Sequence, residues 1–136
     1  MLQAYSSNLS VAANAAFPLN NSVVSKGNAE VLSAPASIQL NQRGVYSVKV
    51  NGFATPAAAT LVSVQLYLNN VAIPQAISSF TGVASAADNF GFETLVQVMD
   101  NNCPCNCAAS PAVLQIRNGI TALTDAHINV IVTKIR

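Results

Sequence analysis

Charged residues are scarce in this sequence. Asp, Glu, Lys and Arg make up 8% of its 136 residues, and six basic residues against five acidic ones give a formal net charge of +1. Soluble domains usually carry about three times that share of charge. Because the few Lys and Arg residues do not cluster, the chain lacks the positive surface that nucleic-acid binding requires. We therefore expect no nucleic-acid partner.

Long apolar runs are missing as well. Ser, Asn, Gln or Lys interrupts even the densest apolar segments, so no stretch is long enough for a transmembrane helix. The first residues have neither the positive start nor the apolar core of a secretory signal. At the same time 51% of the residues are hydrophobic, which excludes intrinsic disorder. We expect a folded chain that is not inserted into a membrane.

Catalytic and cofactor-binding motifs are also lacking. The sequence has no Gly-rich phosphate loop and no Gly-x-Ser-x-Gly motif, and His127 is the single histidine. Four carboxylates lie singly in separate loops or strands: Asp88, Glu93, Asp100 and Asp125. Their spacing fits neither an acid–base pair nor a calcium loop, although a lone calcium site of Asp and Asn oxygens stays open. We predict that the protein is not an enzyme, with no catalytic residues and no cofactor.

Three cysteines lie within five residues, at Cys103, Cys105 and Cys107. Thiolates are good zinc and iron ligands, but chelating cysteines usually have two or more residues between them. Three sulfurs from one chain also do not complete a four-ligand site, although copies around a symmetry axis would add ligands. Disulfides within or between chains, or free thiols in a structural loop, are therefore favoured over a metal site.

Polar and apolar residues alternate with a period of two along most of the chain. In 44–50, the side chains of Tyr46, Val48 and Val50 share one face, as in a half-buried strand. Asn69-Asn70 marks a tight turn, because Asn tolerates positive φ angles. The expected strands are 30–32, 37–40, 44–50, 61–68, 71–73, 76–80, 90–99, 113–118 and 127–135. Short strands separated by Gly, Pro and Asn predict an all-β fold, an antiparallel β-sandwich of the jelly-roll type.

The first part of the chain differs in composition. Residues 1–29 are rich in Ser, Asn and Ala and contain few bulky side chains. We interpret them as an N-terminal arm for attachment or docking, followed by a jelly-roll domain over 30–136. The alternative is a leader that completes an edge strand.

Two predicted strands are apolar on both faces. The last one carries Ile131 and Ile135 on the face opposite its other apolar residues. The strand over 90–99 carries Leu95 opposite Phe90 and Phe92. A chain of this size has little material to cover both faces of a sheet, and few charges to keep copies apart. We predict a permanent, closed homo-oligomer; the alternative is a monomer with an Asn-, Ser- and Thr-coated surface.

Three segments resemble strands of a known family. Gly44-Val45-Tyr46 is similar to the Gly-x-Tyr strand of trimeric jelly rolls of the tumour-necrosis-factor and complement-globular-head type. The segment 61–70, LVSVQLYLNN, resembles the hairpin strand that follows in bacterial and phage members, and 92–98, FETLVQV, resembles a later core strand. The resemblance covers 30–136 and implies a jelly roll of eight or ten strands that forms a homotrimer. We place the trimer interface on six residues: Tyr46, Phe90, Phe92, Leu95, Ile131 and Ile135.

The resemblance implies display, adhesion or decoration of a particle. Similar small domains are found in phage head-fibre or decoration proteins and at the tips of spore-surface filaments. Because the chain has no collagen-like Gly-x-y stalk, we predict a stand-alone virion component that decorates a phage capsid and attaches through residues 1–29. The alternative is an adhesin or lectin-like domain on a bacterial cell or spore surface. Tyr5, Tyr46 and Tyr67, together with the Asn-rich loops, are candidate glycan contacts.

Overall fold

The computed structural model describes residues 1–33, 36–99, 107–109 and 112–136. Within these ranges all regular secondary structure is β-strand. The described residues contain no helix that is long and apolar enough to cross a membrane. The strands are β1 (Leu2–Val11), β2 (Asn21–Ser25), β3 (Glu30–Ser33), β4 (Ser37–Leu40), β5 (Gly44–Pro56), β6 (Leu61–Leu68), β7 (Val71–Thr81), β8 (Asp88–Met99), β9 (Cys107–Ala109), β10 (Ala112–Asn118) and β11 (Leu123–Lys134).

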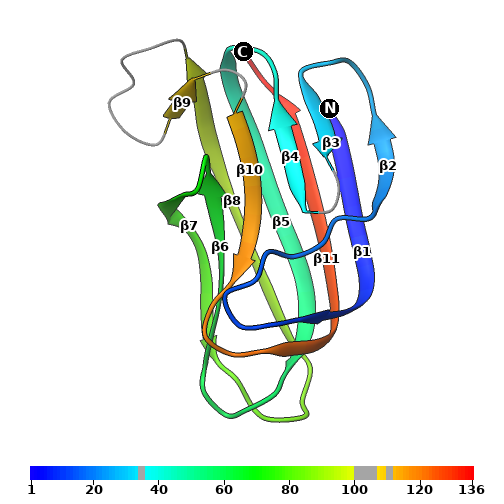
Figure 1. The fold of residues 1–136 in the computed structure, drawn as a ribbon, viewed down its shortest axis with the longest axis vertical. Coiled ribbons are helices and arrows are strands. Elements are labelled where there is room, and N and C mark those ends of the chain that lie inside the picture. The colour runs from blue at the N-terminus through cyan, green and yellow to red at the C-terminus, as the bar shows by residue number, and fades with distance from the viewer. Residues whose placement is uncertain (34–35, 100–106, 110–111) are drawn as a thin grey trace.

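The strands form two stacked sheets (Figure 1). The six-stranded sheet has the order β2-β1-β11-β5-β8-β9, and the five-stranded sheet has the order β3-β4-β10-β6-β7. Neighbouring strands are antiparallel, apart from the short parallel pair of β8 and β9. The predicted fold class, an all-β antiparallel sandwich of the jelly-roll type, is confirmed.

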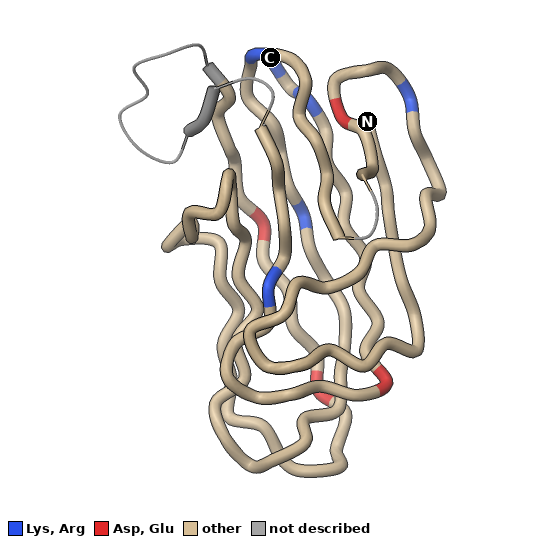
Figure 2. Tube along the Cα trace, in the orientation of Figure 1, with Lys and Arg blue, Asp and Glu red and all other residues tan. Residues whose placement is uncertain are grey.

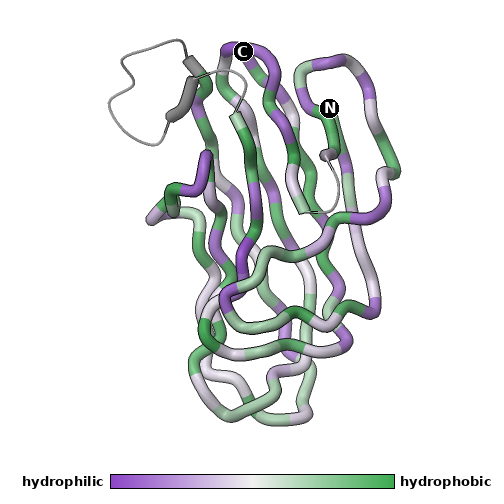
Figure 3. Tube along the Cα trace, in the orientation of Figure 1, coloured by the Kyte–Doolittle hydropathy of each residue, from purple (hydrophilic) through white to green (hydrophobic). Residues whose placement is uncertain are grey.

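The period-two alternation decides which side chains enter the core. Along β5, Tyr46, Val48 and Val50 are buried between the sheets, whereas Lys49 and Asn51 are exposed. Figure 3 shows apolar and polar residues alternating along most strands. Packing the two apolar faces together removes them from water, which stabilises the sandwich by about 25 cal/mol for each Å² of apolar surface buried.

Most of the predicted strands are confirmed. β4 and β6 have the predicted bounds, and β3, β8 and β10 differ from prediction by one or two residues. The hairpin between β6 and β7 turns at Asn69 and Asn70, whose φ angles are 49° and 66°. Both lie in the left-handed region that a two-residue hairpin uses, so the Asn-Asn turn is confirmed as well.

A bulge explains why the start of β11 was not predicted. The pairing of β11 with β5 shifts between Thr124 and His127, and Asp125 has a φ of 48°. The shift breaks the period of two, so the residues before His127 do not show a strand pattern in the sequence. On β5, a Cβ on Gly52 would collide with the main-chain oxygen of His127, which is why glycine is needed opposite this bulge.

Residues 1–29 are part of the sandwich, which corrects the expected division into an arm and a domain. β1 lies inside the six-stranded sheet, between β2 and β11. Leu2, Phe17 and Leu19 are fully buried, and the Phe17 ring packs against the Phe90 ring with 5.7 Å between centroids. The two parts therefore share one core, and the chain is not divided at residue 30.

The composition of β1 explains why this strand was not predicted. After Leu2, its next inward side chains are the small Ala4 and Ser6. The pairing with β11 then shifts between Ser6 and Leu9, and Asn8 has a φ of 55°. The buried Ser6 hydroxyl accepts a hydrogen bond from the Asn20 N–H at 2.8 Å, so this polar group is satisfied inside the fold. Small inward residues and a bulge together removed the alternation by which strands are recognised.

Candidate functional site

The outer face of the six-stranded sheet mixes amide and apolar side chains. Two rows cross β1, β11, β5 and β8 in register: Gln3–Ile131–Lys49–Glu93 and Tyr5–Asn129–Asn51–Gly91. Beside these rows, Leu95 is 56% exposed, Ile135 51% and Phe53 45%. Single exposed apolar residues are ordinary, but several on one sheet face mark a candidate contact surface.

An aromatic cluster occupies one end of this face. The Phe53 and His127 rings stack at 5.3 Å between centroids with 12° between their planes, and the Tyr5 ring lies 6.4 Å from the His127 ring. The rings come from β1, β11 and β5, which are adjacent in the sheet. Aromatic side chains bury large areas at little entropic cost and dominate the energetics of many interfaces.

The cluster does not form a catalytic triad. The Ser7 hydroxyl oxygen lies 3.1 Å from Nδ1 of His127, which is a hydrogen-bond distance. Among the residues that the structure describes, no carboxylate bonds to the His127 ring, so the acidic member of a triad is not in place. The arrangement fits packing against a partner better than nucleophilic chemistry.

The charges on this face are few and opposite. Lys49 on β5 and Glu93 on β8 are directly opposite in the register, and they are the charged residues of the two rows. Figure 2 shows how thinly charge is spread over the whole trace. Burying such a face against a partner therefore desolvates little charge, which keeps the cost of association low.

The six predicted interface residues fall into two groups. Leu95 and Ile135 are exposed and Ile131 is half-buried on the outer face of the six-stranded sheet. Tyr46 and Phe90 point inward and are 0% and 4% exposed, and Phe92 is partly buried against the core. These three were assigned to a contact surface from their apolar character alone. The structure corrects this for Tyr46 and Phe90, which belong to the core of a single chain.

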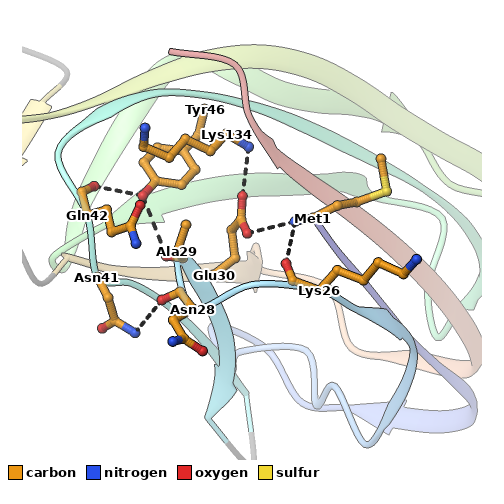
Figure 4. A network of polar contacts seen from close by, with 9 residues as sticks. All are labelled: Met1, Lys26, Asn28, Ala29, Glu30, Asn41, Gln42, Tyr46 and Lys134. Atoms are coloured by element: carbon orange, nitrogen blue, oxygen red, sulfur yellow. Dashed lines mark hydrogen bonds and ion pairs between the residues drawn. The ribbon is translucent and has the colours of Figure 1, made fainter.

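A buried carboxylate joins the two sheets at one corner of the sandwich (Figure 4). Glu30 of β3 is fully buried, and its two oxygens have different partners. Oε1 accepts a hydrogen bond from the Lys134 N–H of β11 at 2.7 Å, and Oε2 lies 2.9 Å from the amino group of Met1. Both contacts run from the five-stranded sheet to the six-stranded sheet, so the corner has a structural role.

Tyr46 completes this corner. Its hydroxyl donates to the Gln42 carbonyl at 2.7 Å. Burial raises the pKa of Tyr46 above its ordinary value, the hydrogen bond to Gln42 acts in the opposite direction, and the negative charge of Glu30 adds to the increase. Neither Glu30 nor the corner was singled out from the sequence. Its only signal was an acidic residue at the start of an otherwise apolar strand.

The cysteine predictions lie largely outside the described residues. Cys103 and Cys105 are not described, and for Cys107 the structure gives the backbone of β9, which pairs with Gln97 of β8. Within the described ranges, no group of three or more His, Cys, Asp or Glu residues is placed to hold a metal. The choice between thiols, disulfides and metal stays a prediction.

The outer face of the five-stranded sheet has a different character. A hollow of about 350 Å³ lies on it, lined by Asn69, Asn70, Val113 and Gln115. At its side, the Arg117 guanidinium carbon lies 4.3 Å from the centroid of the Tyr67 ring. Tyr67 was one of the three candidate glycan contacts; Tyr5 lies on the other sheet and Tyr46 is buried. Gln115 and Arg117 were missed, although the alternation over 113–118 puts both on one strand face.

Comparisons with known proteins agree with this architecture. No protein-family model matches the sequence, and a search of curated proteins finds no match. Among solved structures, the globular domain of zebrafish complement 1qA protein matches with a TM-score of 0.73 and 8% identity, over 99% of this chain and 96% of that chain. Eiger TNF from S. frugiperda matches with a TM-score of 0.69 and 14% identity, over 99% and 92% of the two chains.

A viral protein has the same fold. PRD1 vertex protein P5 matches with a TM-score of 0.65 and 18% identity, over 99% of this chain and 96% of that chain. Identities this low establish the fold and leave function to be argued from the surface. The chain has the jelly-roll fold of tumour-necrosis-factor-like and complement-1q-like globular domains.

Proposed function

We propose that the chain is a non-enzymatic structural protein that forms a homotrimer and decorates a virus particle. The observation that carries the trimer is the outer face of the six-stranded sheet, where Leu95, Phe53 and Ile135 are exposed beside a nearly uncharged surface. A symmetric ring of three copies would cover this face on every subunit. The remaining surface has no excess of either charge that would oppose permanent association.

The fold shared with PRD1 vertex protein P5, whose name places it at a vertex, supports a virion location. Residues 1–29 build the sandwich, so the attachment to the particle uses the folded surface rather than a free arm. A bacterial cell-surface or spore-coat adhesin is the second candidate. The amide-lined hollow on the five-stranded sheet favours it, because such a surface suits a ligand.

Electron microscopy with gold-labelled antibodies against the chain distinguishes decoration of a virus particle from a role as a cell-surface or spore-coat adhesin. The antibodies are applied to thin sections and to culture fluid of the cells that carry the gene. Label on virus particles supports decoration of a virion. Label on cell walls or spore coats without particles would instead establish the adhesin reading and overturn the first proposal.

A further inference from the structure

Each side-chain amide oxygen of the hollow already accepts a hydrogen bond from the chain itself. The Asn70 Oδ1 accepts from Arg117 Nη2 at 2.6 Å, and the Gln115 Oε1 accepts from Arg117 Nε and Nη2 at 3.1 and 2.9 Å. The Asn69 Oδ1 accepts from the Val113 N–H at 2.8 Å. Because only an amide oxygen can accept these bonds, the orientation of all three amides is fixed by their donors.

The same contacts leave several donors without a partner. The side-chain nitrogens of Asn69 and Asn70 have no partner among the described residues, nor has Nη1 of Arg117. The Gln115 nitrogen donates one of its two hydrogens to Ser37 Oγ at 3.0 Å. A ligand that enters the hollow therefore meets unpartnered N–H donors, which acceptors on the ligand would satisfy.

The charge of Arg117 is not neutralised. Its partners are two neutral amides and the Tyr67 ring, and the ion pair found in the described part of the chain is elsewhere, between Met1 and Glu30. The fork of bonds and the aromatic contact hold the guanidinium in one position without an acid. A fixed, uncompensated guanidinium attracts a carboxylate by its charge, and the free Nη1 of Arg117 can donate to a carboxylate oxygen.

We infer that this hollow is a binding site for an acidic sugar, with the Arg117 guanidinium on the sugar carboxylate and the amides of Asn69, Asn70 and Gln115 on its ring and hydroxyl oxygens. The volume of about 350 Å³ is within the range of small-ligand sites. One cation and several neutral donors match a ligand with one negative charge and many acceptors, rather than a densely charged phosphate.

The site lies on the opposite sheet from the proposed subunit interface. β6 and β10 carry it in the five-stranded sheet, whereas Leu95 of β8 and the aromatic cluster belong to the six-stranded sheet. Association through the six-stranded sheet would leave the hollow open on every subunit. The inference goes beyond the structural role and does not depend on the number of subunits.

A matched pair of probes tests the inference on the full chain. Methyl α-D-glucuronopyranoside and methyl α-D-glucopyranoside differ only in a carboxylate against a hydroxymethyl group. Saturation-transfer NMR titrations give both affinities, and side-chain amide shifts in ¹⁵N-labelled protein locate the site. We expect the glucuronoside to bind at least about tenfold more tightly and to shift the amide signals of Asn69, Asn70 and Gln115.

Two variants assign the charge that is responsible. Arg117→Gln should reduce glucuronoside affinity about tenfold, to the level of the glucoside, because the carboxylate loses the positive charge and the Nη1 donor of Arg117. Lys26→Gln removes an exposed cation outside the hollow and should leave the affinity unchanged. Thermal unfolding followed by circular dichroism shows whether each variant is folded. If Arg117→Gln does not fold, the amide shifts of the wild-type protein still locate the binding site.

Three results would overturn the inference. The first is equal affinity for the two sugars, or no binding of either. The second is an unchanged affinity in folded Arg117→Gln, or shifts at amides outside the hollow. The third is full displacement of the glucuronoside by equimolar acetate or inorganic phosphate, which would show that a bare anion suffices and the sugar ring contributes nothing.

Discussion

The outer faces of the two sheets come from the same alternation of residues and present different chemistry. On the six-stranded sheet, Leu95 and Phe53 are exposed, and Lys49 lies opposite Glu93. On the five-stranded sheet, Gln115 and Arg117 line and flank a hollow, and the Arg117 charge has no acidic partner among the described residues. The first face carries an aromatic cluster and a balanced pair of charges, whereas the second carries an amide-lined hollow beside a cation without an acidic partner.

The inner faces show no such difference. Ile128 and Val130 of the six-stranded sheet and Leu66 and Leu114 of the five-stranded sheet are all fully buried aliphatic side chains. Such side chains pack equally well in any sandwich, so they specify the fold. The outward positions are free of that demand, and their differences are therefore where function can be read. We assign association to one face and ligand binding to the other.

The largest expected effect comes from a charge on the six-stranded face. Leu95→Asp puts a carboxylate near Glu93 and into the proposed interface, where it would be desolvated without a partner. We expect the dissociation constant of the trimer to rise at least about 100-fold, as for an interface hot spot. Sedimentation velocity over a concentration series measures it.

The matched control is Gln39→Asp, which adds the same charge to the outer face of the five-stranded sheet. Gln39 is half-buried on β4, in register with Val113. The sedimentation coefficient should stay that of the wild type. If this variant dissociates and Leu95→Asp does not, the roles of the two faces are the reverse of our assignment.

Next in size is the loss of the contact that joins the sheets. Glu30→Gln removes the buried carboxylate that holds the Met1 amino group and the Lys134 N–H. We expect the free energy of unfolding to fall by about 1–2 kcal/mol, because a Gln oxygen can still accept from the Lys134 N–H while the half-exposed Met1 amino group loses its charged partner. Urea unfolding measures the change. The exposed Asp88→Asn should change stability by less than about 0.5 kcal/mol, and equal effects of the two variants would refute a special role for the corner.

The raised pKa of Tyr46 should make the stability of the fold depend on pH in the alkaline range. Its pKa is raised by burial above the ordinary value of 10.0. As pH rises through about 10, the unfolded chain loses this proton while the folded chain keeps it, so stability is complete below pH 10 and falls above it. Tyr46→Phe should cost about 1 kcal/mol at neutral pH for the hydrogen bond to Gln42 and should decline less steeply above pH 10. Denaturant unfolding between pH 7 and 11 measures the free energy of unfolding of both proteins. A parallel decline of the two values above pH 10 would contradict this prediction.

The smallest expected effect concerns the five-stranded face. Arg117→Gln removes a partly exposed cation from the Tyr67 ring and should lower the free energy of unfolding by less than about 1 kcal/mol. It should leave the sedimentation coefficient unchanged. Dissociation of this variant would show that the ligand face also takes part in association.

The sequence was sufficient for the regular part of the fold. In strands such as β4 and β6, inward and outward residues alternate without interruption, so the bounds of these strands could be predicted closely. Asn69-Asn70 is a sequence typical of a tight turn, which the positive φ angles of both residues confirm. β1 and the start of β11 could not, because bulges at Asn8 and Asp125 change the period where the strands bend. A period-two pattern identifies a strand only where its pairing is regular.

The functional surfaces were harder to predict, since periodicity divides a strand into two faces without saying which one is inward. Phe90 and Leu95 lie on opposite faces of β8, and the sequence placed both at the interface. The register of β5 and β8 resolves them, because Phe90 packs on Phe17 in the core and Leu95 lies outside. The amides around Arg117 come from the β6–β7 turn and β10, which only the fold brings together.

The proposal that the six-stranded face joins three subunits is tested most directly by the mass of the wild-type protein in solution. Size-exclusion chromatography with light scattering at micromolar concentration should give three chains of 14.1 kDa, about 42 kDa, and the mass should not fall on dilution. A mass of 14.1 kDa across that range would contradict the account, because the exposed face would then have no partner copy.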